Sequence, residues 1–158
     1  MHMGTRILSP AEVLPETGIN QTLVGLCAGT IVLTLDGELP VEHLAIGDRV
    51  ITRSSGTAIL RDIVITQTVL TPIRIKAGSL GHTRPDRDML VAPEAQLHIR
   101  DWRAEALFGK PSAMVPARRL IDGEFVAEEM TRMVTLFNLV FDRPQVIYAD
   151  GLEIGAGL

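Results

Sequence analysis

The chain has 158 residues, of which 46% are hydrophobic but only 4% aromatic, and its formal net charge is −4. This length fits one domain with an aliphatic core. The acidic balance and the lack of a basic run exclude nucleic acid and anionic membrane surfaces as expected partners. The longest apolar stretches are too short for membrane insertion, so we expect a soluble protein with no N-terminal signal peptide.

Residues that bind metals or form disulfides are few and scattered along the chain. Cys27 is the only cysteine, so no internal disulfide forms and no oxidising compartment is required. The histidines lack the spacing of a zinc site, since they stand at His2, His43, His82 and His98. The sequence therefore predicts no metal and no cofactor.

The N-terminal part differs from the rest of the chain in its pattern. Residues 1–26 carry prolines and glycines without a sustained hydrophobic period, which predicts an upstream segment, either an extended arm or a short added strand. From Cys27 onward, short β-type runs alternate with turn residues. Strands are expected at 31–35 and 49–52, with a helical turn at 40–44 between them. Asp36-Gly37 is typical of a hairpin turn.

Short β-type runs also alternate with turn residues in the downstream part of the chain. In chain order, we expect a long bent strand at 58–70, a strand at 73–75, a loop at 77–87, a broken strand pair at 89–91 and 96–99 around Pro93, a helical turn at 116–120, the longest strand at 130–142 and a last hairpin at 145–148. Residues 104–108 do not distinguish helix from strand. Many short strands with little helix predict an all-β fold, either barrel-like or a sandwich.

The residues around the single cysteine resemble the opening of a Hint domain, the hedgehog/intein self-processing module. Cys27-Ala28-Gly29-Thr30 leads into the first strand, Pro40-Val41-Glu42 follows its turn, and Gly47-Asp48-Arg49-Val50 begins the next strand. Further segments resemble the bacterial subgroup often called Hint_2, namely 73–81, 106–109, 115–118, 141–143 and 149–151. We therefore divide the chain into an upstream arm or precursor segment (1–26), a Hint-like domain (27–152) and a C-terminal tail (153–158).

The resemblance implies a fold and a chemistry. The fold is an all-β, intein-like horseshoe of many short antiparallel strands with one or two helical turns, and the cysteine lies near its centre. In the family, the cysteine thiol attacks the preceding carbonyl, which here belongs to Leu26. The N→S acyl shift turns the Leu26–Cys27 peptide bond into a thioester that a second nucleophile cleaves. The partner is then the chain's own N-terminal segment in cis, in the bacterial cytoplasm or within an exported precursor.

The chain departs from the family pattern at the residues that assist this cysteine. The second Hint motif, Thr or Ser followed three residues later by His, matches Ala92 and Ala95, which offer neither a hydroxyl nor a proton carrier. A later family histidine is replaced by Pro144, and the His-Asn pair of splicing inteins is missing from 153–158. We therefore expect no complete splicing, and at most a single-turnover autoproteolytic cleavage.

Two other residues are candidate helpers for Cys27. His98 lies three residues after Ala95, and an odd spacing along a strand turns its side chain to the opposite face unless a bulge resets the register. Asp88 lies just before the expected strand at 89–91. The competing interpretation of Cys27 is a buried structural thiol, since free cysteine is often buried.

The leading hypothesis is an impaired Hint-type self-processing domain. The alternative is a non-catalytic β-domain that acts as a binding or structural module of a longer precursor. A third possibility is an active self-cleaver that recruits another base. Oligomeric state and the acceptor of the thioester stay open at this point.

Overall fold

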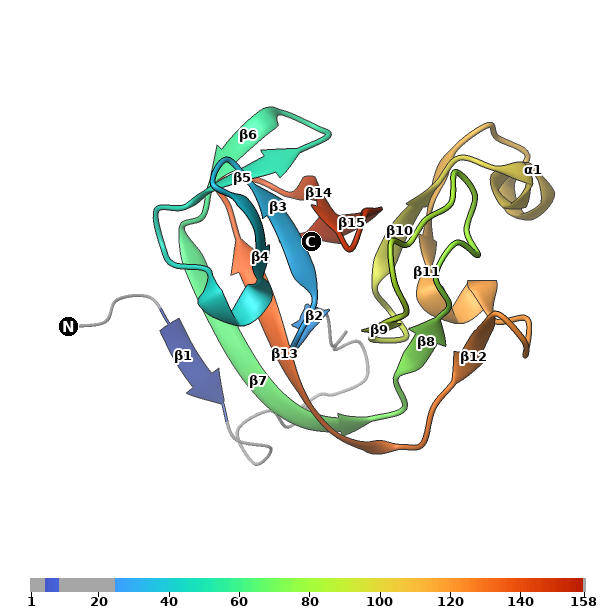
Figure 1. Cartoon of the computed structure of the whole chain (residues 1–158), viewed down its shortest axis with the longest axis horizontal. Helices are drawn as coiled ribbons and strands as arrows, with labels where there is room; N and C mark the ends of the chain where they lie inside the picture. Colours follow the sequence, from blue (N-terminus) through green and yellow to red (C-terminus); the bar gives the residue numbers. More distant parts are fainter. Residues whose placement is uncertain (1–4, 9–24, 158) are drawn as a thin grey trace.

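A computed structural model describes residues 5–8 and 25–157 of the chain. The strands form a horseshoe whose two arms are joined along its base by long curved strands (Figure 1). The described residues form mostly antiparallel β-sheet, and among them are one short α-helix, α1 (Trp102–Phe108), and two 3₁₀ turns, η1 (Val41–His43) and η2 (Ala117–Leu120). The expectation of an all-β, intein-like horseshoe is confirmed.

The first sheet has seven strands and contains the cysteine. In spatial order it runs β1 (Thr5–Leu8), β7 (Asp62–Leu70), β13 (Arg132–Val140), β2 (Leu26–Cys27), β9 (Met89–Val91), β8 (Ile73–Ile75) and β12 (Val126–Glu128). Strand β1 pairs with β7 in parallel, and the other pairings of this sheet are antiparallel.

The second sheet has eight strands. In spatial order it runs β11 (Ala113–Pro116), β10 (Gln96–Ile99), β15 (Leu152–Ala156), β14 (Gln145–Ala149), β3 (Ile31–Thr34), β5 (Arg49–Thr52) and β6 (Gly56–Ile59), and β4 (Gly37–Pro40) pairs with β3. The core between the sheets is aliphatic, as the composition predicts, and its fully buried side chains include Leu60, Ile73, Leu97, Ile147 and Ile154.

The two nine-residue strands β7 and β13 form the base of the horseshoe. They pair in unbroken antiparallel register from Arg132 opposite Leu70 to Val140 opposite Asp62. Figure 1 shows both strands curving from one arm to the other. Because β2 adds to the inner edge of β13, this long pair sets the position of the cysteine.

Two local features explain elements that the sequence indicated or left open. At the β3–β4 hairpin, Gly37 has φ +104°, and the Thr34 hydroxyl donates to its carbonyl oxygen at 2.8 Å. Helix α1 covers the ambiguous 104–108 segment. Asp101 caps its first turn by accepting a hydrogen bond from Arg103 N at 2.9 Å, and Gly109 ends the helix at φ +67°.

The broken strand pair at 89–91 and 96–99 is a wrong prediction in one respect. Both segments are strands, but they do not pair with each other: β9 joins β2 and β8 in the first sheet, whereas β10 joins β11 and β15 in the second. The intervening turn, closed by Ala95 N donating to Ala92 O at 3.0 Å, carries the chain from one sheet to the other. A local pattern cannot distinguish such a crossover from a hairpin.

The predicted C-terminal tail is also wrong for most of its length. Strand β15 pairs with β14 along Leu152–Ala156, and Ile154 is only 1% exposed. The sequence did not predict this strand because the segment contains Glu153 and Gly155, and both residue types are depleted in strands. The predicted upstream segment lies outside the described residues except for Thr5–Leu8 and the residues from Gly25 onward; Thr5–Leu8 forms a strand added to β7.

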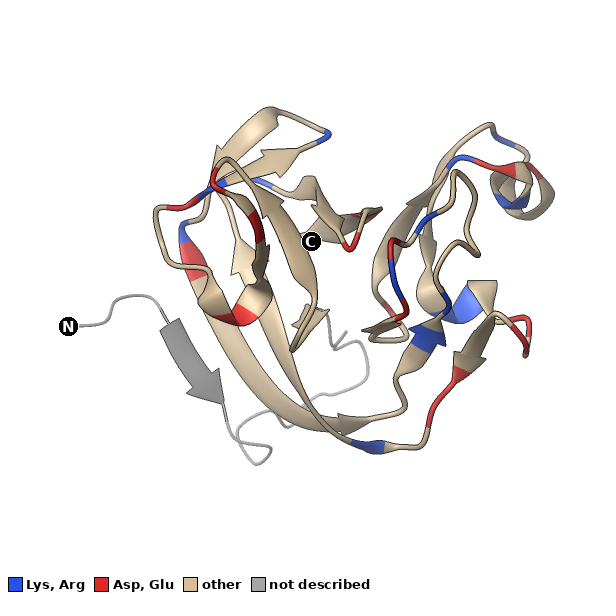
Figure 2. Cartoon of the chain, viewed as in Figure 1, with Lys and Arg blue, Asp and Glu red and all other residues tan. Residues whose placement is uncertain are grey.

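The surface of the described residues carries both charge signs. Acidic and basic positions are interspersed over both arms of the horseshoe (Figure 2). Within residues 5–8 and 25–157, no helix has the length and apolar character needed to cross a membrane. The expectation that nucleic acid is not a partner stays a prediction.

The burial of β15 leads to a stability prediction. Ile154→Ala removes a side chain packed opposite Ile147 and Leu97, so we expect a loss of about 2–5 kcal/mol in the free energy of unfolding. Urea denaturation followed by circular dichroism measures it. Ile59→Ala, at a position 40% exposed, is the matched control and should change stability by under about 1 kcal/mol. Equal stability of both variants would contradict the assignment of this strand to the core.

Candidate functional site

The Leu26–Cys27 peptide bond is held by strands on both sides. On one side Cys27 lies opposite Leu136 and Leu26 opposite Phe137 on β13. On the other side Leu26 lies opposite Val91 on β9. The Cys27 carbonyl also accepts a hydrogen bond from Thr30 N at 3.2 Å. A strand of two residues is thereby fixed near the centre of a seven-stranded sheet.

Cys27 is buried in a small apolar cluster of its own. It is 5% exposed and packs with Ala92 and Leu136, and the partly buried side chains around them are Leu70, Leu90 and Val134. Burial raises the pKa of the thiol from 9.0 to about 11, and the positive charge of Arg132 lowers it in part. At neutral pH Cys27 is therefore a thiol rather than a nucleophilic thiolate.

The backbone immediately before the bond requires glycine. Gly25 has φ +133°, and a Cβ atom at this position would lie 3.1 Å from both the carbonyl carbon and the carbonyl oxygen of Phe137. Glycine thus permits an unusual backbone conformation and a close approach to β13 at the same residue. The position of the Leu26 carbonyl depends on this contact.

The two alanines of the second Hint motif lie beside this bond. Ala92 is fully buried against the cysteine cluster. Ala95 lines a cavity of about 20 Å³ together with Gly25 and Leu26. The rest of the lining carries no ionisable side chain and consists of Gln96, Phe137, Asn138, Leu139, Ile154, Gly155, Ala156 and Gly157. Ala92 therefore packs with Cys27 and Ala95 lines a cavity with Leu26, and both side chains are methyl groups.

His98 does not lie with Cys27. It is on β10 in the other sheet, and its Nδ1 is hydrogen-bonded to Oε1 of Glu153 at 2.6 Å. Glu153 is 8% exposed and also pairs with Arg53 at 3.5 Å and Arg100 at 3.3 Å. His98 lines a separate polar cavity of about 370 Å³ whose lining does not include Cys27. The structure therefore does not bring together the base and the nucleophile that the substitution hypothesis needs.

Asp88 and Pro144 lie in two different parts of the structure. Asp88 lies just before β9, and its carboxylate accepts a hydrogen bond from Ala77 N at 2.9 Å, which closes the 77–87 loop. It lines a cavity of about 200 Å³ that also contacts Ala28 and Arg74. Pro144 is exposed in the turn between β13 and β14. Asp88 thus approaches the residues after Cys27, whereas Pro144 lies on the surface.

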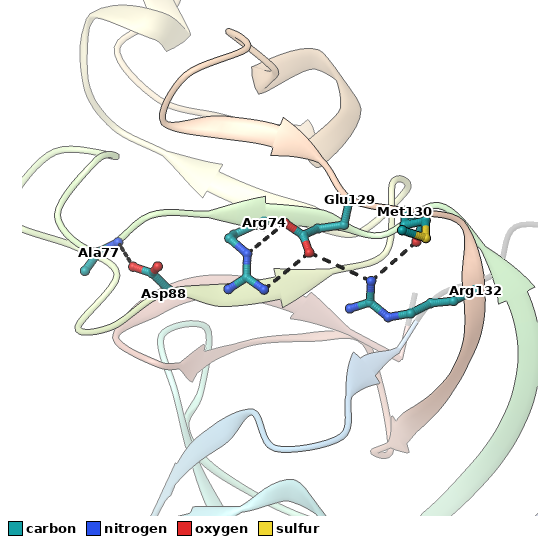
Figure 3. Close-up of polar contacts among 6 residues, drawn as sticks. All are labelled: Arg74, Ala77, Asp88, Glu129, Met130 and Arg132. Carbon is teal, nitrogen blue, oxygen red and sulfur yellow. Dashed lines mark hydrogen bonds and ion pairs between the residues drawn. The ribbon is translucent and has the colours of Figure 1, made fainter.

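A group of charged residues near the cysteine was missed by the sequence reasoning. Arg74 on β8 and Arg132 on β13 are both paired with Glu129, which precedes β13 (Figure 3). No motif marks these residues. The only signal is that Arg132 and Leu136 share one face of a strand, and this becomes informative only when the register opposite Cys27 is known.

Several solved structures share this fold. An intein-like domain from Clostridium thermocellum is 15% identical, with a TM-score of 0.55 over 85% of this chain and 99% of its own. The gp41-1 intein is 12% identical, with a TM-score of 0.55 over 84% of this chain and 98% of its own. A variant of the Ssp DnaB mini-intein is 13% identical, with a TM-score of 0.51 over 85% of this chain and 99% of its own. At these identities the likeness shows an intein-type fold.

The sequence identifies the family. The family model described as Hint domain matches residues 24–155, so the chain belongs to the Hint domain family, in the group named Hint_2. No curated protein matches the chain. The matched range includes both Leu26 and Cys27 as well as most of β15.

The raised pKa of Cys27 predicts a specific dependence of stability on pH. Below pH 9 the thiol is protonated in both states, but between about pH 9 and 11 only the unfolded chain ionises, so the folded state loses stability as pH rises. The loss is on the order of 2 kcal/mol and is absent in Cys27→Ala. Urea denaturation of both proteins across this range measures the difference. Parallel profiles would contradict a buried thiol of raised pKa.

Proposed function

We propose that this chain is a Hint-type self-processing domain that acts in cis on its own Leu26–Cys27 peptide bond. In this copy the chemistry is impaired because Ala92 and Ala95 occupy the motif positions. The observation that carries the proposal is the arrangement of β2, where the bond is held between β13 and β9 with both alanines beside it. Family membership supplies the reaction type.

The reaction proceeds through a thioester. The Cys27 thiol gives up its proton, and the thiolate sulfur attacks the Leu26 carbonyl carbon to form a C–S bond. The C–N bond then breaks as the departing nitrogen of Cys27 takes up a proton and becomes its free α-amino group. Attack on the thioester by water or by an added thiol releases residues 1–26 and restores the Cys27 thiol.

The impairment has two physical causes. A pKa of about 11 leaves only about one thiol in ten thousand ionised at pH 7. In addition, among the described residues 5–8 and 25–157, the lining of the cavity next to Leu26 includes no ionisable side chain that could protonate the departing amide nitrogen. A positioned general acid or base contributes about 10²–10⁴-fold to such a step.

The end of β15 lies at the proposed reaction centre. Gly155, Ala156 and Gly157 line the same small cavity as Leu26. None of these three residues has a side chain that can attack a carbonyl, so they do not supply the second nucleophile.

The second candidate function is a non-catalytic β-module of a longer precursor. Its support is the apolar surrounding of Cys27, which is also the surrounding of an inert structural thiol. The two candidates differ in whether Cys27 ever forms a thioester, and this difference is measurable by mass.

The wild-type chain should cleave slowly and only through Cys27. After incubation with dithiothreitol at pH 8, we expect the mass of residues 1–26 to accumulate over days, and hydroxylamine should release the same segment as its hydroxamate. Intact-mass spectrometry measures both products. Cys27→Ala is the control and should give neither. Complete cleavage within minutes would contradict impairment, and no Cys27-dependent product would favour the non-catalytic module.

Restoring the two motif residues should accelerate cleavage. We expect Ala92→Thr with Ala95→His to raise the rate at least about 100-fold, because the imidazole then lies beside Leu26 and can protonate the departing nitrogen. Ala92→Thr with Ala95→Gln is the matched control, since it fills the site without a proton carrier. The measurement is again the mass of the released segment. Equal rates in the two double variants would show that the missing imidazole is not the cause.

A further inference from the structure

We propose that Arg132, held in place by Glu129 and Arg74, supplies the positive charge that stabilises the Cys27 thiolate in this chain. This inference rests on the proposed function, since a thiolate is required only if Cys27 acts as a nucleophile. It assigns a charge-stabilising role to a residue outside the Cys27 and Ala92–Ala95 motifs.

The register of β13 places Arg132 on the side of Cys27. Side chains alternate along a strand, so Arg132, Val134 and Leu136 face the same way. Leu136 lies directly opposite Cys27, and Val134 packs on the cysteine cluster. Arg132 itself lies opposite Leu70, which packs on the same cluster. Arg132 therefore lies at the edge of the apolar cluster that surrounds the thiol.

The other charged groups near the thiol are already engaged. On β7, the residues at the Arg132 end of the strand, Thr66–Leu70, are uncharged. Before β9, the Asp88 carboxylate is bound to the Ala77 amide. On β8, Arg74 is bound to Glu129 through two contacts. Among these groups, only Arg132 counteracts the effect of burial on the pKa of Cys27.

Arg132 contacts Glu129 at a longer distance than Arg74 does (Figure 3). Arg74 Nε lies 2.9 Å from Glu129 Oε2 and its Nη2 3.4 Å from Oε1, whereas Arg132 Nη1 lies 3.8 Å from Oε1. Arg132 also donates to the Met130 carbonyl at 3.4 Å. The carboxylate is thus mainly neutralised by Arg74, and two longer contacts hold the Arg132 guanidinium. Glu129 and Asp88 both act on Arg74, so Arg132 is the cation of this group with the weaker hold on a carboxylate.

A guanidinium can perform one part of the missing chemistry and not the other. Its fixed positive charge favours a nearby thiolate, but arginine does not lose its proton in proteins and so cannot pass one to the departing amide. Arg132 can therefore favour the Cys27 thiolate, but it gives no proton to the departing amide nitrogen. Cleavage under these conditions depends on Cys27 and is slow.

The test measures thiolate formation without using cleavage. Cys27 is the only cysteine, so the rate of its alkylation by iodoacetamide, followed by mass on the full chain at pH 8 to 10, reports the thiolate fraction. We expect Arg132→Met to lower the rate roughly three- to tenfold, since one pKa unit corresponds to about a tenfold change. Arg132→Lys, which keeps the charge, should stay near the wild-type rate.

The sign of the change separates charge from packing. If Arg132 only packed against the cluster, Arg132→Met would admit water, lower the pKa of Cys27 and raise the alkylation rate. Arg61→Met, which breaks an exposed pair with Asp142, is the control and should leave the rate unchanged. An Arg132→Met rate equal to or above wild type, or an Arg132→Lys rate as low as that of Arg132→Met, would overturn the proposal.

Glu129→Gln keeps the proposal testable if Arg132→Met does not fold. This change removes the negative charge that competes for Arg132, nearly preserves side-chain volume and leaves an amide oxygen that can still accept from the Arg132 guanidinium, so we expect the alkylation rate to rise. Because the contact that holds Arg132 is kept, an unchanged or lower rate would overturn the role of Arg132. Because each readout is alkylation, a chain that never cleaves can still pass this test, and the two proposals can fail separately.

Discussion

The pairing of the two-residue strand β2 with β13 and β9 is the constraint on which the site depends. It holds the Leu26–Cys27 bond between two strands and brings Gly25 into close approach with Phe137. The same pairing places the Cys27 side chain among Ala92 and Leu136, where water is excluded. Positioning of the peptide bond and suppression of the thiolate are therefore two consequences of one arrangement.

This arrangement sets what a cysteine would need in order to react at such a site. Burial removes the water that would stabilise the thiolate. Another group must therefore stabilise the thiolate before the cysteine can act as a nucleophile at neutral pH. A positive charge stabilises the thiolate, whereas a proton donor assists the departing amide nitrogen. Different residues can supply these two functions. Under the proposed function, Arg132 supplies the charge, and Ala92 and Ala95 supply no proton donor.

The sequence predicted the fold and the position of Cys27 well, because both depend on local signals. Strand-forming runs broken by Asp36-Gly37 and similar turns define many short strands, and the residues after Cys27 carry the Hint resemblance. The pairing of β9 with β8 and β2, and not with β10, depends on contacts between distant segments, and so does the inclusion of Glu153 in a core strand. The position of Arg132 was unpredictable for the same reason, since it requires the register of β13 against β2.

The packing around Cys27 does not require polar side chains at positions 92 and 95. A threonine and a histidine buried beside Cys27 would each need hydrogen-bond partners, because an unsatisfied buried polar group is costly. Alanines at 92 and 95 remove that requirement, and the described part of the chain contains no buried side-chain nitrogen or oxygen without a partner. Alanines at these positions are therefore compatible with a satisfied, well-packed centre. The position of the Leu26–Cys27 bond depends on strand pairing and not on polar side chains at 92 and 95.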